Sequence, residues 1–215
     1  MLSDAELVAQ ARGGSQDAFR ELVLRFERPV FSLVARMVHD PATAEDLAQE
    51  VFVKAFRRLD TYDPQRKLSS WLFKIAHNTT IDFLRRGELD TVPLEAREDE
   101  GDRGSLAGVL ADETAEGPGA AAERRQMARS LERAIARLRP EYRESVLLFY
   151  VEGLAYQEIC EITGQPLGTV KTNLHRARKE LAAVMTEMGW SPAPNIGTGS
   201  GSGAKPVPPP SRRAG

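Results

Sequence analysis

The chain has 215 residues, of which 28% are charged and 41% are hydrophobic, and its formal net charge is −2. This composition is typical of a soluble protein of one or two small domains. The single cysteine excludes an intramolecular disulfide, and no cluster of ligands indicates a metal or another cofactor. Neither a signal peptide nor an apolar run of ~20 residues is present, so we expect a cytoplasmic protein without membrane insertion.

The first part of the chain, residues 1–87, is predicted to be a helical domain. Ser3 and Glu6 form a capping box that begins a first helix, and the glycine pair at residues 13–14 ends it. A second helix over residues 16–39 follows, with apolar residues at helical spacing.

Two further helices complete this first domain. The pair Asp40 and Pro41 begins one of them, because Asp is a good N-cap and Pro suits the first helical position. The segment 62–64 closes that helix. The last helix is predicted to open at Ser69 or Ser70, to run to Arg86 and to stop at the glycine that follows.

Residues 88–122 lose the helical periodicity and hold ten acidic residues against two arginines. They are predicted to form an acidic flexible linker, and both a plain tether and a role of its own stay open for it. Residues 188–215 are rich in Gly, Ser and Pro, and are predicted to be a disordered tail.

The helical pattern returns over residues 123–187, which form the second predicted domain. A helix from Glu123 halts at Pro140, and a short one over residues 141–151 ends before Gly153. Residues 155–162 then form a helix that Gly164 ends, and Gln165 with Pro166 begins the next. Two helices joined by a short turn with a glycine are typical of a helix-turn-helix. The predicted fold class is therefore all-α, with two small helical domains joined by the linker.

The last helix has two distinct faces. Its apolar stripe contains Leu167, Val170, Leu174, Ala177 and Leu181. The opposite face contains Gly168, Thr172, His175, Arg176 and Lys179, flanked by Thr169, Lys171, Asn173 and Arg178. No acidic residue interrupts the stretch 171–179. A solvated bundle helix would explain the charges alone. The turn chemistry, the apolar register and the acid-free face together favour a recognition helix in the major groove.

Several sequence words resemble those of extracytoplasmic-function sigma factors of bacterial RNA polymerase. In the second domain they are Tyr156–Gln157–Glu158–Ile159, Pro166–Leu167–Gly168–Thr169–Val170–Lys171–Thr172 and Leu174–His175–Arg176–Ala177–Arg178. In the first they are Asp46–Leu47–Ala48–Gln49–Glu50–Val51–Phe52, Ser70–Trp71–Leu72–Phe73–Lys74–Ile75–Ala76–His77–Asn78 and Asp82–Phe83–Leu84–Arg85–Arg86. The resemblance covers about residues 4–87 and 123–187.

The resemblance implies a polymerase-binding role for the helix that begins at Asp40–Pro41. In the family this domain binds the β′ clamp helices of core RNA polymerase, and here that role falls on Asp46, Gln49 and Glu50. Periodicity places Val53 and Arg57 on the same outer side. The inward side is predicted to hold Leu47, Val51, Ala55 and Leu59. The implied partners are core polymerase (β′ and β subunits), promoter DNA and an anti-sigma factor.

The helix that opens near Ser70 is implied to read the −10 element. Its predicted outer stripe is Trp71, Lys74, Asn78, Asp82 and Arg85, a mixture of an aromatic ring, hydrogen-bonding groups and cations that suits single-stranded DNA. Leu72, Ile75, Ala76, Thr79 and Phe83 are predicted to face the core. Trp71 has a second interpretation as a core anchor. In the family the preceding loop, here residues 61–69, shares the binding pocket, and the last domain reads the −35 element as duplex.

The resemblance predicts an alternative sigma factor that binds core polymerase, directs it to promoters, helps to melt the −10 element and initiates transcription. The main rival is a stand-alone helix-turn-helix regulator, which leaves residues 46–86 without a role. An enzyme is disfavoured, because the sequence holds no phosphate-binding loop, metal cluster or nucleophile elbow. A pure interaction adaptor would not need the basic face at residues 171–179.

Overall fold

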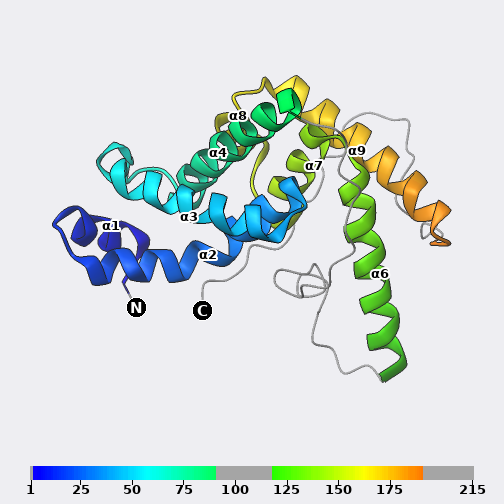
Figure 1. Cartoon of the computed structure of the whole chain (residues 1–215), viewed down its shortest axis with the longest axis horizontal. Coiled ribbons are helices and arrows are strands. Elements are labelled where there is room, and N and C mark those ends of the chain that lie inside the picture. The colour runs from blue at the N-terminus through cyan, green and yellow to red at the C-terminus, as the bar shows by residue number, and fades with distance from the viewer. Residues whose placement is uncertain (1, 91–117, 191–215) are drawn as a thin grey trace. The chain divides into compact units, whose positions relative to one another are not determined.

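A computed structural model describes residues 2–90 and 118–190, and these residues form helices and short connections without any β-strand (Figure 1). The predicted all-α class is confirmed for these ranges. The described helices fall into two compact units: α1 to α4 form the first, and α6, α7, α9 and the start of α8 belong to the second, with Cys160–Gly164 grouped with the first. None of these helices is long and apolar enough to cross a bilayer.

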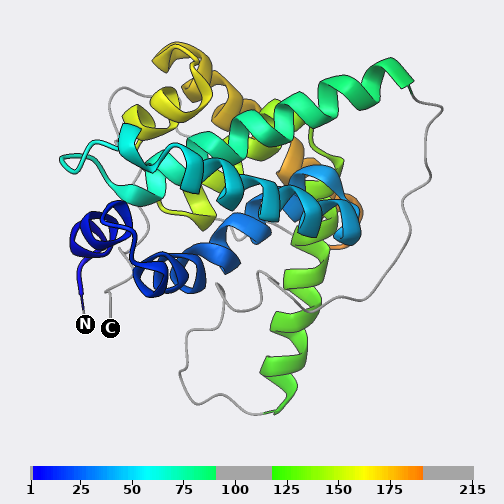
Figure 2. The same cartoon turned by 60° about the vertical axis from the view of Figure 1, so that its left-hand side comes forward.

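The first unit is built around the long helix α2. Its elements are α1 (Asp4–Arg12), α2 (Gln16–Val38), α3 (Pro41–Arg57), the 3₁₀ turn η1 (Leu59–Thr61) and α4 (Leu68–Asp90). α2 packs against α1, α3 and α4, and α3 also packs against α4 (Figures 1 and 2). The core consists of aliphatic side chains at helical spacing, so burial of these apolar faces holds the unit together.

The predicted start signals of α1 and α3 are confirmed. The Ser3 side chain accepts from the Glu6 backbone N–H at 3.3 Å, and Glu6 accepts from the Ser3 backbone N–H at 2.7 Å, which is a complete capping box. The Glu6 carboxylate also accepts from the Ser3 hydroxyl at 2.8 Å, and the two hydrogen bonds that it accepts from Ser3 hold the pKa of Glu6 below its usual range. Asp40 accepts from the Thr43 backbone N–H at 2.8 Å, with Pro41 in the first turn of α3.

Three predicted boundaries in the first unit are wrong. α3 ends at Arg57 and η1 intervenes, so the helix is closed before residues 62–64. α4 begins at Leu68, ahead of the predicted Ser69 or Ser70, because Leu68 is buried in the core. At its other end α4 continues through Gly87 to Asp90. A glycine inside a helix costs only about 1 kcal/mol, which a long helix tolerates.

The second unit contains α6 (Pro118–Arg137), α7 (Pro140–Val146), a π-helical turn η2 (Leu147–Val151) and α9 (Leu167–Glu187), together with the first residues of α8 (Tyr156–Thr163). α9 packs against both α6 and α7. α6 begins at Pro118 and not at Glu123. The single helix predicted over 141–151 is α7 with η2 as its continuation. Every residue from Tyr142 to Phe149 is buried, so this segment has no polar face from which a regular period could be predicted.

A buried arginine ties α6 to α7. Arg143 is 6% exposed, and its guanidinium donates to the backbone carbonyls of Ile135, Ala136 and Leu138 at 3.2, 2.7 and 2.8 Å. These acceptors are at the C-terminal end of α6, where helix carbonyls lack intrahelical partners. Burial lowers the pKa of Arg143 to about 10, so the side chain keeps its charge at neutral pH.

Most of the predicted linker and tail lies outside the described residues. Of the predicted linker over residues 88–122, residues 88–90 belong to α4 and residues 118–122 to α6, so both ends are helical. Residues 91–117 and 191–215 are not described. The domain limits 1–87 and 123–187 therefore stay predictions.

Candidate nucleic-acid and partner interfaces

The outer face of α3 carries the predicted partner-binding residues. Asp46, Gln49, Glu50, Val53 and Arg57 are all exposed. On the other side Leu47, Val51, Ala55 and, after the helix, Leu59 are buried as predicted. Glu50 forms an ion pair with Lys54 at 2.7 Å, and Lys54 also donates to the Thr79 hydroxyl of α4 at 3.1 Å. The face is therefore mostly polar, with Val53 as an exposed apolar residue, and it is fixed at one point to α4.

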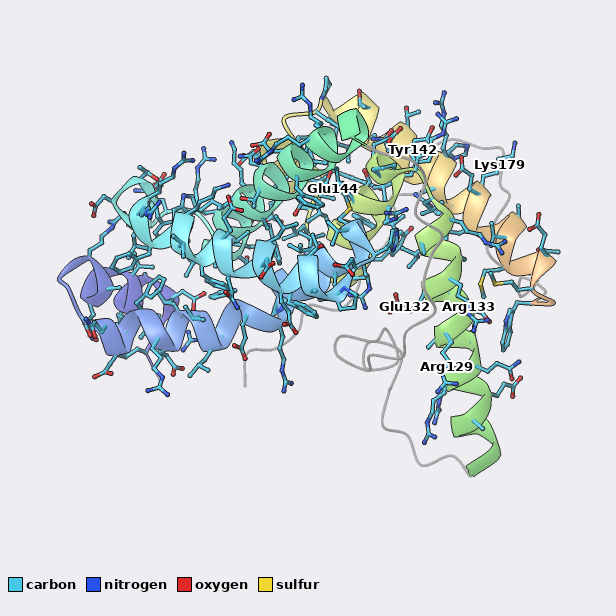
Figure 3. All side chains as sticks on the ribbon, in the orientation of Figure 1. Arg129, Glu132, Arg133, Tyr142, Glu144 and Lys179 are labelled. Carbon is cyan, nitrogen blue, oxygen red and sulfur yellow. The ribbon has the colours of Figure 1, made fainter. Side chains whose placement is uncertain are left out.

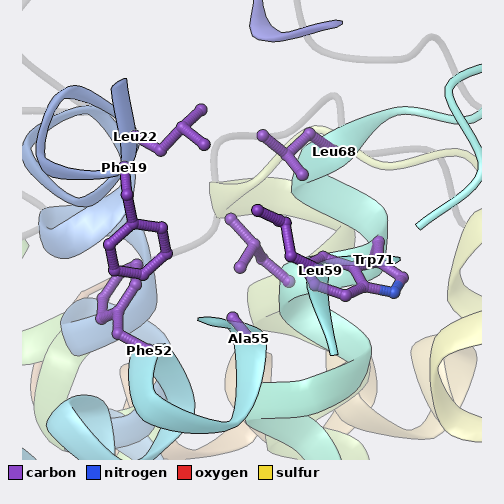
Figure 4. A pocket seen from close by; sticks show the side chains of 8 residues that line it. Phe19, Leu22, Phe52, Ala55, Leu59, Leu68 and Trp71 are labelled. Atoms are coloured by element: carbon purple, nitrogen blue, oxygen red, sulfur yellow. The ribbon is translucent and has the colours of Figure 1, made fainter. Parts of the chain in front are cut away.

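An exposed aromatic residue extends this face. The Phe56 side chain is 57% exposed and meets the Phe19 ring edge-to-face, with 4.9 Å between centroids. Sequence reasoning missed Phe56, although its place outside the buried stripe of α3 was a usable signal. Phe19, Phe52 and Trp71 also line a small apolar pocket between α2, α3, η1 and α4 (Figure 4).

The predicted outer stripe of α4 is exposed at Lys74, Asn78, Asp82 and Arg85. Trp71 differs, because it is half-buried and its ring lies 5.6 Å from the Tyr62 ring. The core-anchor interpretation therefore holds for part of that side chain. The predicted inner residues Leu72, Ile75, Ala76 and Thr79 are buried.

Phe83 was predicted to face the core, and that prediction is wrong, because its side chain is 37% exposed. None of the described side chains of α4 beyond Thr80 is buried. The later turns of α4, as far as Gly87, are at most half-buried, and a residue at an inward position of the helical period stays accessible.

A second arginine fixes the connection between α3 and α4. Arg12 donates through Nε and Nη2 to the Leu59 carbonyl at 3.1 and 2.9 Å, and Nη2 also reaches the Asp60 carbonyl at 3.2 Å. The same nitrogen donates to the Tyr62 carbonyl, and the guanidinium lies 6.0 Å from the centre of the Tyr62 ring. The Tyr62 hydroxyl donates to the Arg66 carbonyl at 2.6 Å. Sequence analysis gave no sign of this cluster.

The environment of Tyr62 disfavours its phenolate form. Burial is the main cause that raises the pKa of Tyr62, and the carboxylates of Asp4 and Asp63 add to it, while Arg12 acts in the opposite direction. The hydroxyl is therefore protonated at neutral pH and stays available as the donor to Arg66.

The turn between α8 and α9 has the predicted geometry. Gly164 adopts the left-handed conformation with φ of 70°, and its N–H donates to the Cys160 carbonyl at 2.9 Å. Pro166 is the N-cap residue of α9. The left-handed conformation at this position strongly favours glycine, because glycine has no Cβ that would clash with the backbone.

The recognition face of α9 is open. Gly168, Thr169, Lys171, Thr172, His175, Arg176 and Lys179 are all exposed. Arg176 donates to the Tyr142 hydroxyl of α7 at 3.3 Å, which raises the pKa of Arg176, and Thr172 donates to the Gly168 carbonyl at 2.8 Å. Figure 3 labels Tyr142 on α7 and Lys179 on α9. The face thus presents cations together with short polar side chains.

The buried side of α9 departs from the prediction at two positions. Val170, Leu174 and Ala177 are fully buried and Leu181 is half-buried, but Leu167 is 39% exposed because it stands in the first turn. Asn173, predicted to flank the outer face, is 6% exposed and donates to the Gln165 side chain at 3.0 Å. That hydrogen bond satisfies its amide away from water.

A left-handed glycine turn followed by a helix with an exposed basic face defines a DNA-binding protein of the helix-turn-helix class. Residues 22–88 match the Sigma-70 region 2 family, and residues 128–181 match Sigma-70 region 4. The ECF RNA polymerase sigma factor SigW of Bacillus subtilis is 34% identical over 84% of this chain and 96% of its own length. The ECF RNA polymerase sigma-E factor of Escherichia coli K12 is 34% identical over 84% of this chain and 93% of its own.

Solved structures agree with these relatives. CnrH, in complex with the cytosolic domain of CnrY, has a TM-score of 0.59 and 26% identity, covering 86% of this chain and 97% of its own. The chain belongs to the ECF family of RNA polymerase sigma factors. It is an alternative sigma factor that directs core RNA polymerase to particular promoters. The match of region 2 gives α2 to α4 a role that a stand-alone helix-turn-helix regulator would leave unexplained.

Proposed function

We propose that the three faces described above divide the work of promoter-directed initiation. In this proposal the outer face of α3 binds the β′ clamp helices, the outer stripe of α4 reads the −10 element as a single strand, and α9 reads the −35 element as duplex. Residues 1–87 and 123–187 act as the two domains, residues 88–122 join them and residues 188–215 form a tail. The observation that carries the proposal is that every candidate residue except the half-buried Trp71 is exposed.

The chemistry of α9 supports duplex reading. Lys171, Arg176 and Lys179 are cations suited to phosphates, and the exposed N-terminal residues Gly168 and Thr169 are small enough for close approach. A helix N-terminus also favours an anionic phosphate. In the proposed role, the cations of this helix therefore bind the DNA phosphates and position the helix, and the short side chains near its start contact the bases.

The chemistry of α4 supports reading of an unpaired strand. An aromatic ring at Trp71 and a hydrogen-bonding amide at Asn78 stand on the same stripe as the cations Lys74 and Arg85. Single-stranded DNA is held by such combinations of stacking and charge. Capture of unpaired bases here offsets part of the cost of opening the duplex, a few kcal/mol per flipped base.

The proposal also covers catalytic activity, cellular location and regulation by a partner protein. The chain has no catalytic activity of its own, acts in the cytoplasm together with polymerase, and is held inactive by an anti-sigma protein. The solved complex of CnrH with the cytosolic domain of CnrY supports a regulatory protein partner of this kind.

The test compares one variant from each face with a matched control. Gln49→Ala, Asn78→Ala and Lys171→Ala are assayed with core polymerase for core binding and for run-off transcription from a promoter library. Gln126→Ala, at an exposed position of α6, is the control. We expect Gln49→Ala to weaken core binding, whereas the other two variants bind core normally and lose transcription at −10-dependent and −35-dependent promoters respectively. Normal transcription by all three variants would refute the assignment of the faces.

A further inference from the structure

The cluster around Arg12 connects the start of the chain to the −10 reading region. Its acceptors at Leu59, Asp60 and Tyr62 lie 47 to 50 residues further along the chain. They are backbone carbonyls of η1 and of Tyr62, the residue that follows it, and the Leu59 carbonyl also accepts from the Tyr62 N–H at 3.1 Å. The planar guanidinium fork presents several fixed donors, so one side chain can hold all three carbonyls in one arrangement.

Tyr62 connects the carbonyls held by Arg12 to two neighbouring parts of the structure. Its ring lies against Trp71, the first residue of the outer stripe of α4, with 5.6 Å between centroids. Its hydroxyl donates to the Arg66 carbonyl at 2.6 Å, which holds the segment between η1 and α4. The backbone of Tyr62 is itself one of the groups that Arg12 holds. Trp71 and residues 62–66 therefore share one anchor.

We propose that Arg12 is a positioning residue for −10 recognition, which sets the place of Trp71 and of residues 62–66 without touching DNA itself. This inference rests on the proposed reading of the −10 strand by α4 and the preceding loop. Base discrimination depends on side chains held close to one productive geometry, so release of the anchor reduces selectivity before it reduces affinity for polymerase.

A purely structural role for Arg12 has a different signature. If Arg12 only stabilised the fold, its loss would lower the stability of the first unit and weaken every activity in parallel, including binding to core polymerase through α3. A positioning role instead changes preference among −10 sequences, while core binding and thermal unfolding stay close to those of the wild-type protein.

The first experiment uses the full chain with core polymerase. Arg12→Gln removes the charge and the fork, Arg12→Lys keeps the charge, and Arg28→Gln, at an exposed position of α2, is the control. Each protein is tested on promoters with single-base changes in the −10 element, both as closed duplex and pre-melted over that element. We expect Arg12→Gln to lose a factor of about ten in discrimination, the scale of one good base contact, on both templates. Arg12→Lys should recover part of it.

The second experiment needs neither polymerase nor DNA. In a Trp190→Phe background Trp71 is the only tryptophan of the chain, so its fluorescence reports on this site alone. Release of the anchor by Arg12→Gln is expected to increase quenching of Trp71 by acrylamide, with no change for Arg28→Gln.

The outcomes separate the two levels of inference. If the wild-type protein with core shows no dependence on the −10 sequence, the proposed reading by α4 fails, whatever Arg12 does. If the wild-type protein discriminates and Arg12→Gln discriminates equally well, or loses core binding and stability in the same proportion, the positioning role is overturned.

Discussion

Each unit of this sigma factor contains one arginine whose guanidinium collects three backbone carbonyls at the end of a helix or turn, and the two differ in depth. Arg143 is buried, and its acceptors belong to the adjacent helix end. Arg12 is exposed, and its acceptors lie far along the chain, close to the stripe of α4 that we propose to read the −10 element. The same hydrogen-bonding chemistry thus holds two helices together at the buried Arg143, and it holds a loop in place at the exposed Arg12.

The sharpest way to break this comparison is to remove the buried arginine. We expect Arg143→Ala to lower the free energy of unfolding of the second unit by about 3 kcal/mol, because it leaves buried carbonyls without donors. Denaturant unfolding followed by circular dichroism measures the loss. Arg129→Ala, at an exposed position of α6 outside the cluster, is the control and should leave stability unchanged. A loss below about 1 kcal/mol, the scale of an ordinary exposed hydrogen bond, would contradict a cohesive role.

Salt dependence sharpens the contrast between the DNA faces of the two units. Lys179→Ala should reduce the slope of log affinity against log salt for −35 duplex by about 0.9, because one phosphate contact is lost. Lys74→Ala should reduce the corresponding slope for −10 single strand by about 0.7. Fluorescence anisotropy with holoenzyme on each element measures both slopes. A change in sequence preference without a change in slope would assign base contacts to these lysines instead.

Two glycines with different backbone conformations predict opposite effects of the same substitution. Gly164 has a φ of 70°, so Gly164→Ala should destabilise the helix-turn-helix by about 1 kcal/mol. Gly87 lies inside α4, and an added Cβ would meet no atom within 4 Å, so Gly87→Ala should stabilise the first unit by about 0.5–1 kcal/mol. Thermal unfolding of both variants gives the signs, and equal signs would show that one of the two backbone conformations is misassigned.

The smallest effect concerns the capping box of α1. Hydrogen bonds from Ser3 lower the pKa of Glu6 in the folded protein, so the contribution of this carboxylate is present above its unfolded pKa of ~4.3 and is lost as pH falls through the lower folded value. We expect Glu6→Gln to reduce thermal stability slightly at pH 7 and to remove this acid dependence. Glu27→Gln, at an exposed position of α2, should retain it.

Local signals were sufficient where a boundary depends on one residue and its neighbours. The capping box at Ser3, the Asp40 cap and the left-handed Gly164 were predicted because their chemistry acts within four residues. The buried and exposed faces of α3 and most of those of α9 followed from helical periodicity, since burial there repeats with each turn.

The failures have tertiary causes. Burial of Leu68 begins α4 early, and the looser packing of α4 beyond Thr80 leaves Phe83 exposed. Asn173 is turned inward by its hydrogen bond to Gln165. The hydrogen bonds of Arg12 and Arg143 to backbone carbonyls could not be predicted, because the sequence does not distinguish an arginine that binds carbonyls from one that is only solvated. Only the fold brings the acceptors together.

The acceptors of Arg12 are main-chain atoms, and this has a consequence for how the region can diverge. Every amino acid supplies the same carbonyl, so substitutions at Leu59 or Asp60 leave the chemistry of the attachment intact as long as the turn keeps its shape. The sequence of the loop that follows can therefore change while the hydrogen bonds from Arg12 to the backbone remain. Under the proposed reading of the −10 element, promoter preference in descendants of this protein can therefore change by mutation of the loop alone, without a compensating change in the first helix.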